Sequence, residues 1–61
     1  MTYSELERLL RKNGCYPERE GHSHTMWYSP ITGKIFPVGR HGREDVKNGT
    51  LNKILKDAGL K

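Results

Sequence analysis

Apolar residues recur along this chain with two different spacings, and the spacing changes at turn signals. In residues 3–10 they fall three and four positions apart, as on one face of an α-helix. β-branched and aromatic residues then favour strands at Ser23–Tyr28 and Lys34–Val38. Helical spacing returns from about Asn48 to Ala58. With a short strand at Cys15–Arg19, the pattern predicts the order α-β-β-β-α.

Local signals mark where these elements begin and end. The capping-box pattern fits both Thr2-Tyr3-Ser4-Glu5 and Ser4-Glu5-Leu6-Glu7, so the first helix begins at one of these two places. Asn13-Gly14 supplies a left-handed stop for that helix, and Gly59 supplies one for the last helix. Pro17 restricts the first strand to an edge of the sheet.

The turn residues between the second and third strands predict an antiparallel hairpin. Ser29-Pro30-Ile31-Thr32-Gly33 is rich in the residues that turns favour. Alternation along the preceding strand then places His24, Met26 and Tyr28 on one face of the sheet and Thr25 and Trp27 on the other. We expect a single α+β domain over residues 1–61, with two helices packed on one face of a three-stranded antiparallel sheet.

Length and charge narrow the classes of function. A chain of 61 residues buries only about 60% of its unfolded surface, which leaves little room for a deep pocket and favours a shallow site for a large substrate. Eleven Lys and Arg against seven Asp and Glu give a formal charge of +4. Most of this excess lies from Lys34 onward, as expected for a surface that binds a phosphate backbone or for a solvated basic surface.

Cys15 is the only cysteine, which excludes an internal disulfide and a zinc site built on thiolates. A small domain without disulfides fits a reducing cytoplasm. The chain opens on no signal peptide and contains no apolar run of membrane-spanning length. We therefore expect a cytoplasmic protein that does not contact a membrane.

The segment His22-Ser23-His24 carries the clearest candidate for chemistry. Histidine exchanges protons near neutral pH, so His24 could take a proton from a ribose 2′-hydroxyl and protonate a leaving 5′-oxygen. The alternative is a strand histidine that forms only local hydrogen bonds. His22 is the nearest rival, and His41 in the following loop is a possible second proton-transfer group.

Three further hypotheses concern metal binding, phosphate binding and base stacking by side chains in and around this segment. His22, His24 and His41 could together bind a metal ion, although no carboxylate ligand accompanies them, and we expect no metal or other cofactor. Lys34, Arg40 and Arg43 are candidates for phosphate binding or are solvated charges. Trp27, Tyr28 and Phe36 could stack on bases or fill the core; we expect Phe36 in the core and retain Tyr28 as the base-binding candidate.

The combined pattern resembles the HicA-type toxins of bacterial toxin–antitoxin systems, which are small mRNA interferases. The resemblance covers nearly the whole chain. The segments that carry it are Ser4-Glu5-Leu6-x-x-Leu9-Leu10, Asn13-Gly14, Ser23-His24-x-x-Trp27, Val38-Gly39-Arg40-His41-Gly42 and Gly49-Thr50-Leu51-x-x-Ile54-Leu55-x-x-Ala58-Gly59-Leu60.

The family's fold is similar to that of double-stranded-RNA-binding domains, which matches the element order above. Its catalytic histidine lies in a Gly-Ser-His motif, and Ser23-His24 matches the last two positions. His22 stands where the family usually has glycine, so His22 and Ser23 are possible auxiliary residues. Asn48 stands where the family often has proline.

The resemblance implies a metal-independent endoribonuclease with His24 as its catalytic residue and mRNA as its substrate. It also implies a HicB-type antitoxin that binds the toxin and shields this histidine, and we expect any oligomerisation to go through that antitoxin. The competing hypothesis is a non-catalytic RNA-binding module that uses the same sheet and basic loop.

Overall fold

The computed structural model describes all residues from Met1 to Lys61, and its element order confirms the predicted α-β-β-β-α fold. No helix is long and apolar enough to cross a membrane. The elements are α1 (Tyr3–Lys12), β1 (Tyr16–Glu20), β2 (His24–Tyr28), β3 (Ile35–Gly39) and α2 (Asn48–Ala58).

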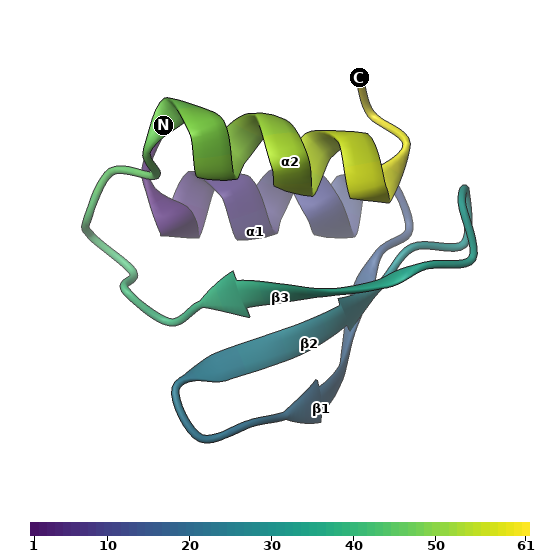
Figure 1. The fold of residues 1–61 in the computed structure, drawn as a ribbon, viewed down its shortest axis with the longest axis horizontal. Coiled ribbons are helices and arrows are strands. Elements are labelled where there is room, and N and C mark those ends of the chain that lie inside the picture. The colour runs from purple at the N-terminus through teal and green to yellow at the C-terminus, as the bar shows by residue number, and fades with distance from the viewer.

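The three strands form one antiparallel sheet in the order β1-β2-β3. A bulge between Pro17 and Arg19 interrupts the register of β1, the edge strand on which Pro17 was predicted to lie. The helices run side by side along the β3 side of the sheet (Figure 1). β1 is therefore the strand farthest from them.

The sheet has two unlike faces, which we call the inner and the outer face. Side chains of the inner face are buried against both helices; they are Thr25, Trp27, Phe36 and Val38. Side chains of the outer face are exposed or half-buried; those of β2 and β3 are His24, Met26, Tyr28, Ile35 and Pro37. The alternation read from the sequence is thus confirmed, and Phe36 lies in the core as expected.

The helices complete the core with the residues that their spacing predicted. Leu6 and Leu10 of α1 are fully buried, as is Ala58 of α2, and Ile54 is 4% exposed. Cys15 is a free, buried thiol that packs in the same cluster. Thr2 is the residue that caps α1, so the first of the two capping-box patterns is the one that forms.

The end of α2 is fixed by a left-handed glycine and by the β2–β3 turn. Gly59 has a φ of +82°, which only glycine adopts readily, and the N–H of Leu60 donates to the carbonyl of Leu55 at 2.8 Å. The buried Ser29 hydroxyl donates to the carbonyl of Ala58 at 2.7 Å. This contact ties the end of β2 to the last turn of α2 and so holds α2 beside the sheet.

Candidate active site

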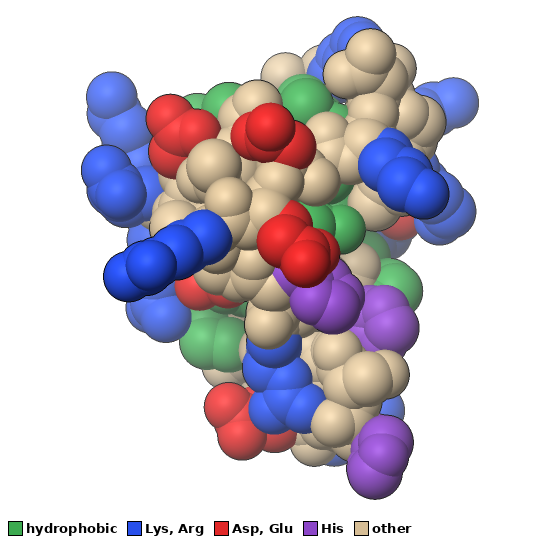
Figure 2. Space-filling view, turned by 90° about the vertical axis from the view of Figure 1, so that its left-hand side faces the viewer, with side chains coloured by type: hydrophobic (Ala, Val, Ile, Leu, Met, Phe, Trp, Pro, Cys, Tyr) green, Lys and Arg blue, Asp and Glu red, His purple; other side chains and the backbone are tan.

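The histidine side chains gather along one flank of the molecule, from the middle of the face to its lower tip, with Lys and Arg around them (Figure 2). His22 is exposed in the tight turn between β1 and β2, which closes with a hydrogen bond from the N–H of Gly21 to the carbonyl of His24 at 2.7 Å. His41 lies in the loop after β3, where its Nδ1 is 3.7 Å from Oε2 of Glu44.

His24 is the first residue of β2 and lies exposed on the outer face. The hydroxyl of Ser23 lies 3.1 Å from its Nδ1, and which of the two donates depends on the tautomer of the ring. No group of the protein forms a hydrogen bond with Nε2. The ring is therefore held through one nitrogen and offers the other to a substrate, which is the arrangement that a general acid or base needs.

Gly39 lies opposite His24 in the register of β2 and β3. A Cβ on Gly39 would meet Cδ2 of His41 at 2.9 Å, closer than side-chain atoms approach one another, and the Tyr3 ring at 3.5 Å. The Tyr3 and His41 rings contact each other edge to face, with centroids 5.4 Å apart. The lack of a side chain at position 39 thus allows the His41 loop and α1 to close against β3 beside His24.

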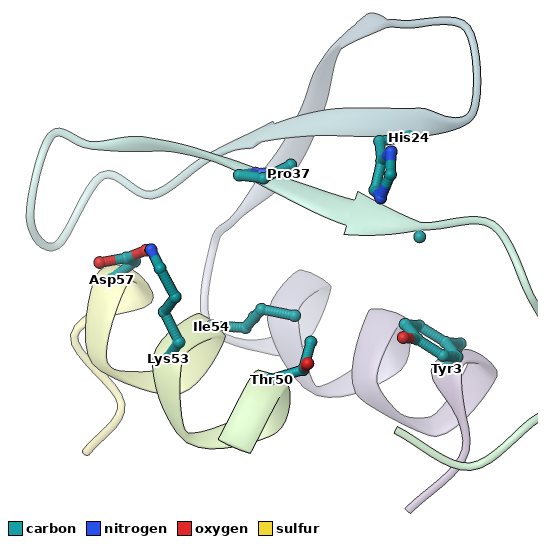
Figure 3. Close-up of a pocket in the computed structure, with 8 residues that line it drawn as sticks. Tyr3, His24, Pro37, Thr50, Lys53, Ile54 and Asp57 are labelled. Carbon is teal, nitrogen blue, oxygen red and sulfur yellow. The ribbon is translucent and has the colours of Figure 1, made fainter. Parts of the chain in front are cut away.

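The surface has a single hollow, and His24 lies on its wall. The hollow has a volume of about 260 Å³ and lies at the β3 edge of the sheet, between residues of β2 and β3 on one side and α2 on the other. The His24 ring extends from β2 toward it, while Thr50, Lys53 and Asp57 face it from α2 and Tyr3 borders it from α1 (Figure 3). Nζ of Lys53 lies 3.2 Å from Oδ2 of Asp57. A proton-transfer group and a cation therefore share one open site.

Lys53 and Thr50 are site residues that the sequence analysis did not single out. Positions 50, 53 and 57 share one face of a helix, next to the apolar positions 51, 54, 55 and 58. That spacing is the only signal in the sequence that could have found them. It does not say that this face of α2 lies across from His24.

Arg40 contacts the turn that precedes His24. Its Nη2 donates to the carbonyls of Gly21, at 2.9 Å, and of His22, and its Nη1 lies 3.8 Å from Oε2 of Glu20. The guanidinium thus fixes the backbone of the turn that leads into His24. Its geometry is that of a residue that positions this turn.

The remaining predicted residues lie outside the hollow. Lys34 is exposed after the β2–β3 turn, and Arg43 is exposed in the loop before α2. Tyr28 lies on the outer face at the opposite end of β2 from His24. No group of three or more His, Cys, Asp or Glu side chains lies close enough to hold a metal ion, so the structure does not bring His22, His24 and His41 together as a metal site.

Comparison with known families yields one match. A family model described as the HicA toxin of bacterial toxin–antitoxin systems matches residues 3–60 of the 61-residue chain. No curated protein and no solved structure matches the chain.

Proposed function

Because the chain belongs to the HicA family and is thus a toxin of a bacterial toxin–antitoxin system, we propose that it is an endoribonuclease that cleaves mRNA with His24 as its acid–base group. One observation carries the proposal. Nε2 of His24 has no partner in the protein and borders the surface hollow, which Lys53 also lines. An open site of this kind suits a phosphodiester within a long polymer better than a small enclosed ligand.

In the proposed reaction, Nε2 of His24 accepts the proton of a ribose 2′-hydroxyl. The 2′-oxygen attacks the adjacent phosphorus, and the bond from phosphorus to the 5′-oxygen of the next nucleotide breaks. The proton on His24 then passes to that 5′-oxygen. The products are a 2′,3′-cyclic phosphate and a free 5′-hydroxyl, so atoms and protons balance without a further reactant.

Lys53 is the cation best placed to stabilise negative charge on the phosphorus in this reaction. Its side chain is 75% exposed and its ammonium group is paired only with Asp57, so it can turn toward a bound phosphate. Lys34 and Arg43 form no ion pair and lie farther along the surface, where they would contact flanking phosphates. The Ser23 hydroxyl would hold the His24 ring in its working orientation through Nδ1.

We further propose that a HicB-type antitoxin neutralises the toxin by covering this site. The family match implies an antitoxin partner, and an inhibitor that covers His24 would block substrate access. Co-expression with the product of the adjacent reading frame should yield a stable complex that lacks ribonuclease activity. Full activity of the purified complex would contradict this part of the proposal.

The proposed reaction can be tested with purified protein and single-stranded RNA in EDTA. We expect cleavage to cyclic-phosphate termini, and we expect His24→Ala to reduce the rate by about 10²–10⁴-fold, the usual contribution of a general acid or base. His22→Ala is the matched control, since it removes an exposed histidine two positions away. RNA binding without cleavage would indicate the non-catalytic module instead, and an inactive His22→Ala protein would move the catalytic assignment to His22.

A further inference from the structure

The outer face carries an aromatic and aliphatic surface that nothing in the protein covers. Residues that pair across neighbouring strands form rows across this face. The row farthest from His24, which we call the far row, consists of Tyr16, Tyr28 and Ile35. Tyr16 and Ile35 are 48% and 50% exposed. Figure 1 shows the helices gathered along β3, well away from β1. So much exposed apolar area in so small a domain indicates a binding surface.

The Tyr16 and Tyr28 rings contact each other on the outer face. Their ring centroids lie 5.3 Å apart with the planes tilted by 44°. Tyr28 is half-buried because Tyr16 lies beside it, whereas Tyr16 leaves about half of its surface open. Aromatic rings displayed on a sheet in this way can stack on unpaired nucleobases, and stacking accepts any base because every base has a flat face.

Cations accompany the tyrosines on the same surface. Arg19 is the register partner of Met26, so its side chain shares the outer face in the middle row. Lys34 lies at the end of the β2–β3 turn and directly precedes Ile35, so its exposed side chain lies beside the far row and not within it. Neither forms an ion pair within the protein. Free cations beside an aromatic pair complement a polymer that has both phosphates and bases.

The far row is also continuous with the candidate active site. His24, Met26 and Tyr28 follow one another along the outer face of β2. The four steps between the five residues His24–Tyr28 span about 13 Å at about 3.3 Å per step. A strand of a few nucleotides can cover that distance, so one RNA could contact the tyrosines while its phosphodiester lies at His24.

We propose that the far row of the outer face, with the Tyr16 and Tyr28 rings, is a stacking platform for unpaired bases, and that the protein therefore binds single-stranded RNA more tightly than duplex RNA. Arg19 and Lys34 bind phosphates on either side of the stacked bases. A duplex hides the faces of its bases and gains nothing from the platform. This inference rests on the proposed ribonuclease function for its substrate, but it concerns binding and not cleavage.

The test measures binding of a fluorescein-labelled oligouridylate to His24→Ala protein by fluorescence anisotropy, so that the RNA survives. Replacing Tyr28 by Leu keeps an apolar side chain but removes the ring, and should raise Kd about tenfold, toward the low end of the effect of losing a stacked base. Tyr16→Leu should have a similar effect. Tyr28→Phe and Tyr16→Phe are the matched controls and should bind as well as the parent, since stacking requires the ring and not the hydroxyl.

Each other outcome has a definite meaning. Equal RNA binding by the Leu and Phe variants would overturn the platform. Leu variants that lose as much affinity for an RNA duplex as for single-stranded RNA would also overturn it. Normal RNA binding by the Leu variants together with loss of antitoxin binding would assign the face to a protein partner and overturn the proposal. If wild-type protein binds but does not cleave, the proposed function fails while the platform stands.

Discussion

Met26 and Trp27 are neighbours in β2, yet Trp27 is 2% exposed in the core whereas Met26 lies half-exposed on the outer face. The same contrast holds along the whole strand. Thr25 and Trp27 face the helices, and His24, Met26 and Tyr28 face outward. One strand thus supplies the centre of the core and the proposed catalytic and base-binding residues.

This contrast shows how a domain of 61 residues carries a site without losing its core. A small domain has a stability of only about 3–9 kcal/mol, so it has few buried side chains to spare. Placing chemistry on the outer face leaves every inner-face position free for packing. Substitutions on the inner face should therefore change stability, and those on the outer face should change activity or binding.

The largest effect should separate Trp27 from Met26. Trp27→Ala removes the largest core side chain and its contact with the Arg11 guanidinium, 5.2 Å from the ring. The expected loss of about 3–5 kcal/mol is a large part of the stability of the domain, so the variant should unfold at a much lower urea concentration than wild type. Met26→Ala, the matched control, should lose about 1 kcal/mol or less. Urea unfolding followed by circular dichroism measures both, and similar losses would break the distinction between the faces.

The second prediction compares a buried serine, Ser29, with an exposed serine, Ser23. The buried Ser29 hydroxyl donates to the carbonyl of Ala58 and accepts from the N–H of Ile31 at 3.2 Å. Ser29→Ala should therefore destabilise the fold by about 1–3 kcal/mol. Ser23→Ala should leave the free energy of unfolding within about 0.5 kcal/mol but slow RNA cleavage, because Nδ1 of His24 loses its partner. Unfolding curves and cleavage rates should give opposite rankings of the two variants.

A third test distinguishes positioning from RNA binding at Arg40. Arg40→Lys keeps the charge but loses the planar fork that reaches the carbonyls of Gly21 and His22. If Arg40 positions the turn before His24, kcat should fall about tenfold while KM and the salt dependence of binding stay unchanged. Arg43→Lys is the control for kcat, because Arg43 lies in an exposed loop and does not bond to the turn before His24. A higher KM with an unchanged kcat in Arg40→Lys would instead indicate a phosphate contact that needs the planar fork.

The fold could be predicted from the sequence because its signals are local. The change of apolar spacing from helical to alternating and back located every element to within about two residues, and Gly59 marked the end of α2. Alternation alone placed Trp27 and His24 on opposite faces of the sheet, and the structure shows that the face of Trp27 is the buried one. These are properties of neighbouring residues, which do not depend on how the elements pack.

The site could be predicted only in part because it joins residues from distant segments. His24 and Ser23 are adjacent, and their pattern identified them as candidates. Arg40 bonds to carbonyls 18 and 19 positions earlier, and Lys53 faces His24 from α2 only through the packing of α2 on β3. No periodicity encodes such long-range contacts, which is why the sequence predicted neither the bonds of Arg40 to the turn before His24 nor the place of Lys53.

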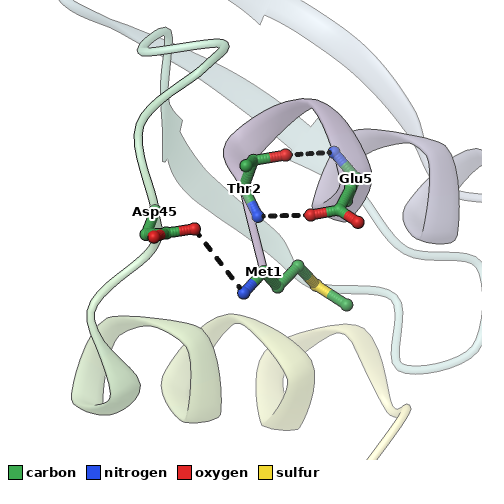
Figure 4. A network of polar contacts seen from close by, with 4 residues as sticks. All are labelled: Met1, Thr2, Glu5 and Asp45. Carbon is green, nitrogen blue, oxygen red and sulfur yellow. Dashed lines mark hydrogen bonds and ion pairs between the residues drawn. The ribbon is translucent and has the colours of Figure 1, made fainter.

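The smallest effect should come from the N-terminal cap of α1, where Thr2 and Glu5 lie outside the hollow. The Thr2 hydroxyl accepts from the N–H of Glu5 at 3.2 Å, and the Glu5 carboxylate accepts from the N–H of Thr2 at 2.8 Å (Figure 4). Thr2→Ala should cost about 1 kcal/mol, as the loss of such a cap usually does. It should leave the rate of RNA cleavage unchanged, because α1 keeps Leu6 and Leu10 in the core.

The same cap gives Glu5 a predicted role in acid stability. The backbone hydrogen bond from Thr2 and the Thr2 side chain lower the pKa of the Glu5 carboxyl below its usual value of 4.5. A lowered pKa in the folded state means that the ionised carboxylate stabilises the fold above its unfolded pKa, and that this contribution is lost as pH falls through the folded value. When melting curves are recorded from neutral to strongly acidic pH, the melting temperature should therefore fall less for Glu5→Gln than for wild type. Glu7→Gln is the matched control, since Glu7 lies outside the cap and forms no hydrogen bond. An equally small fall in the melting temperature of that variant would show that charge alone, and not the cap, sets the response to acid.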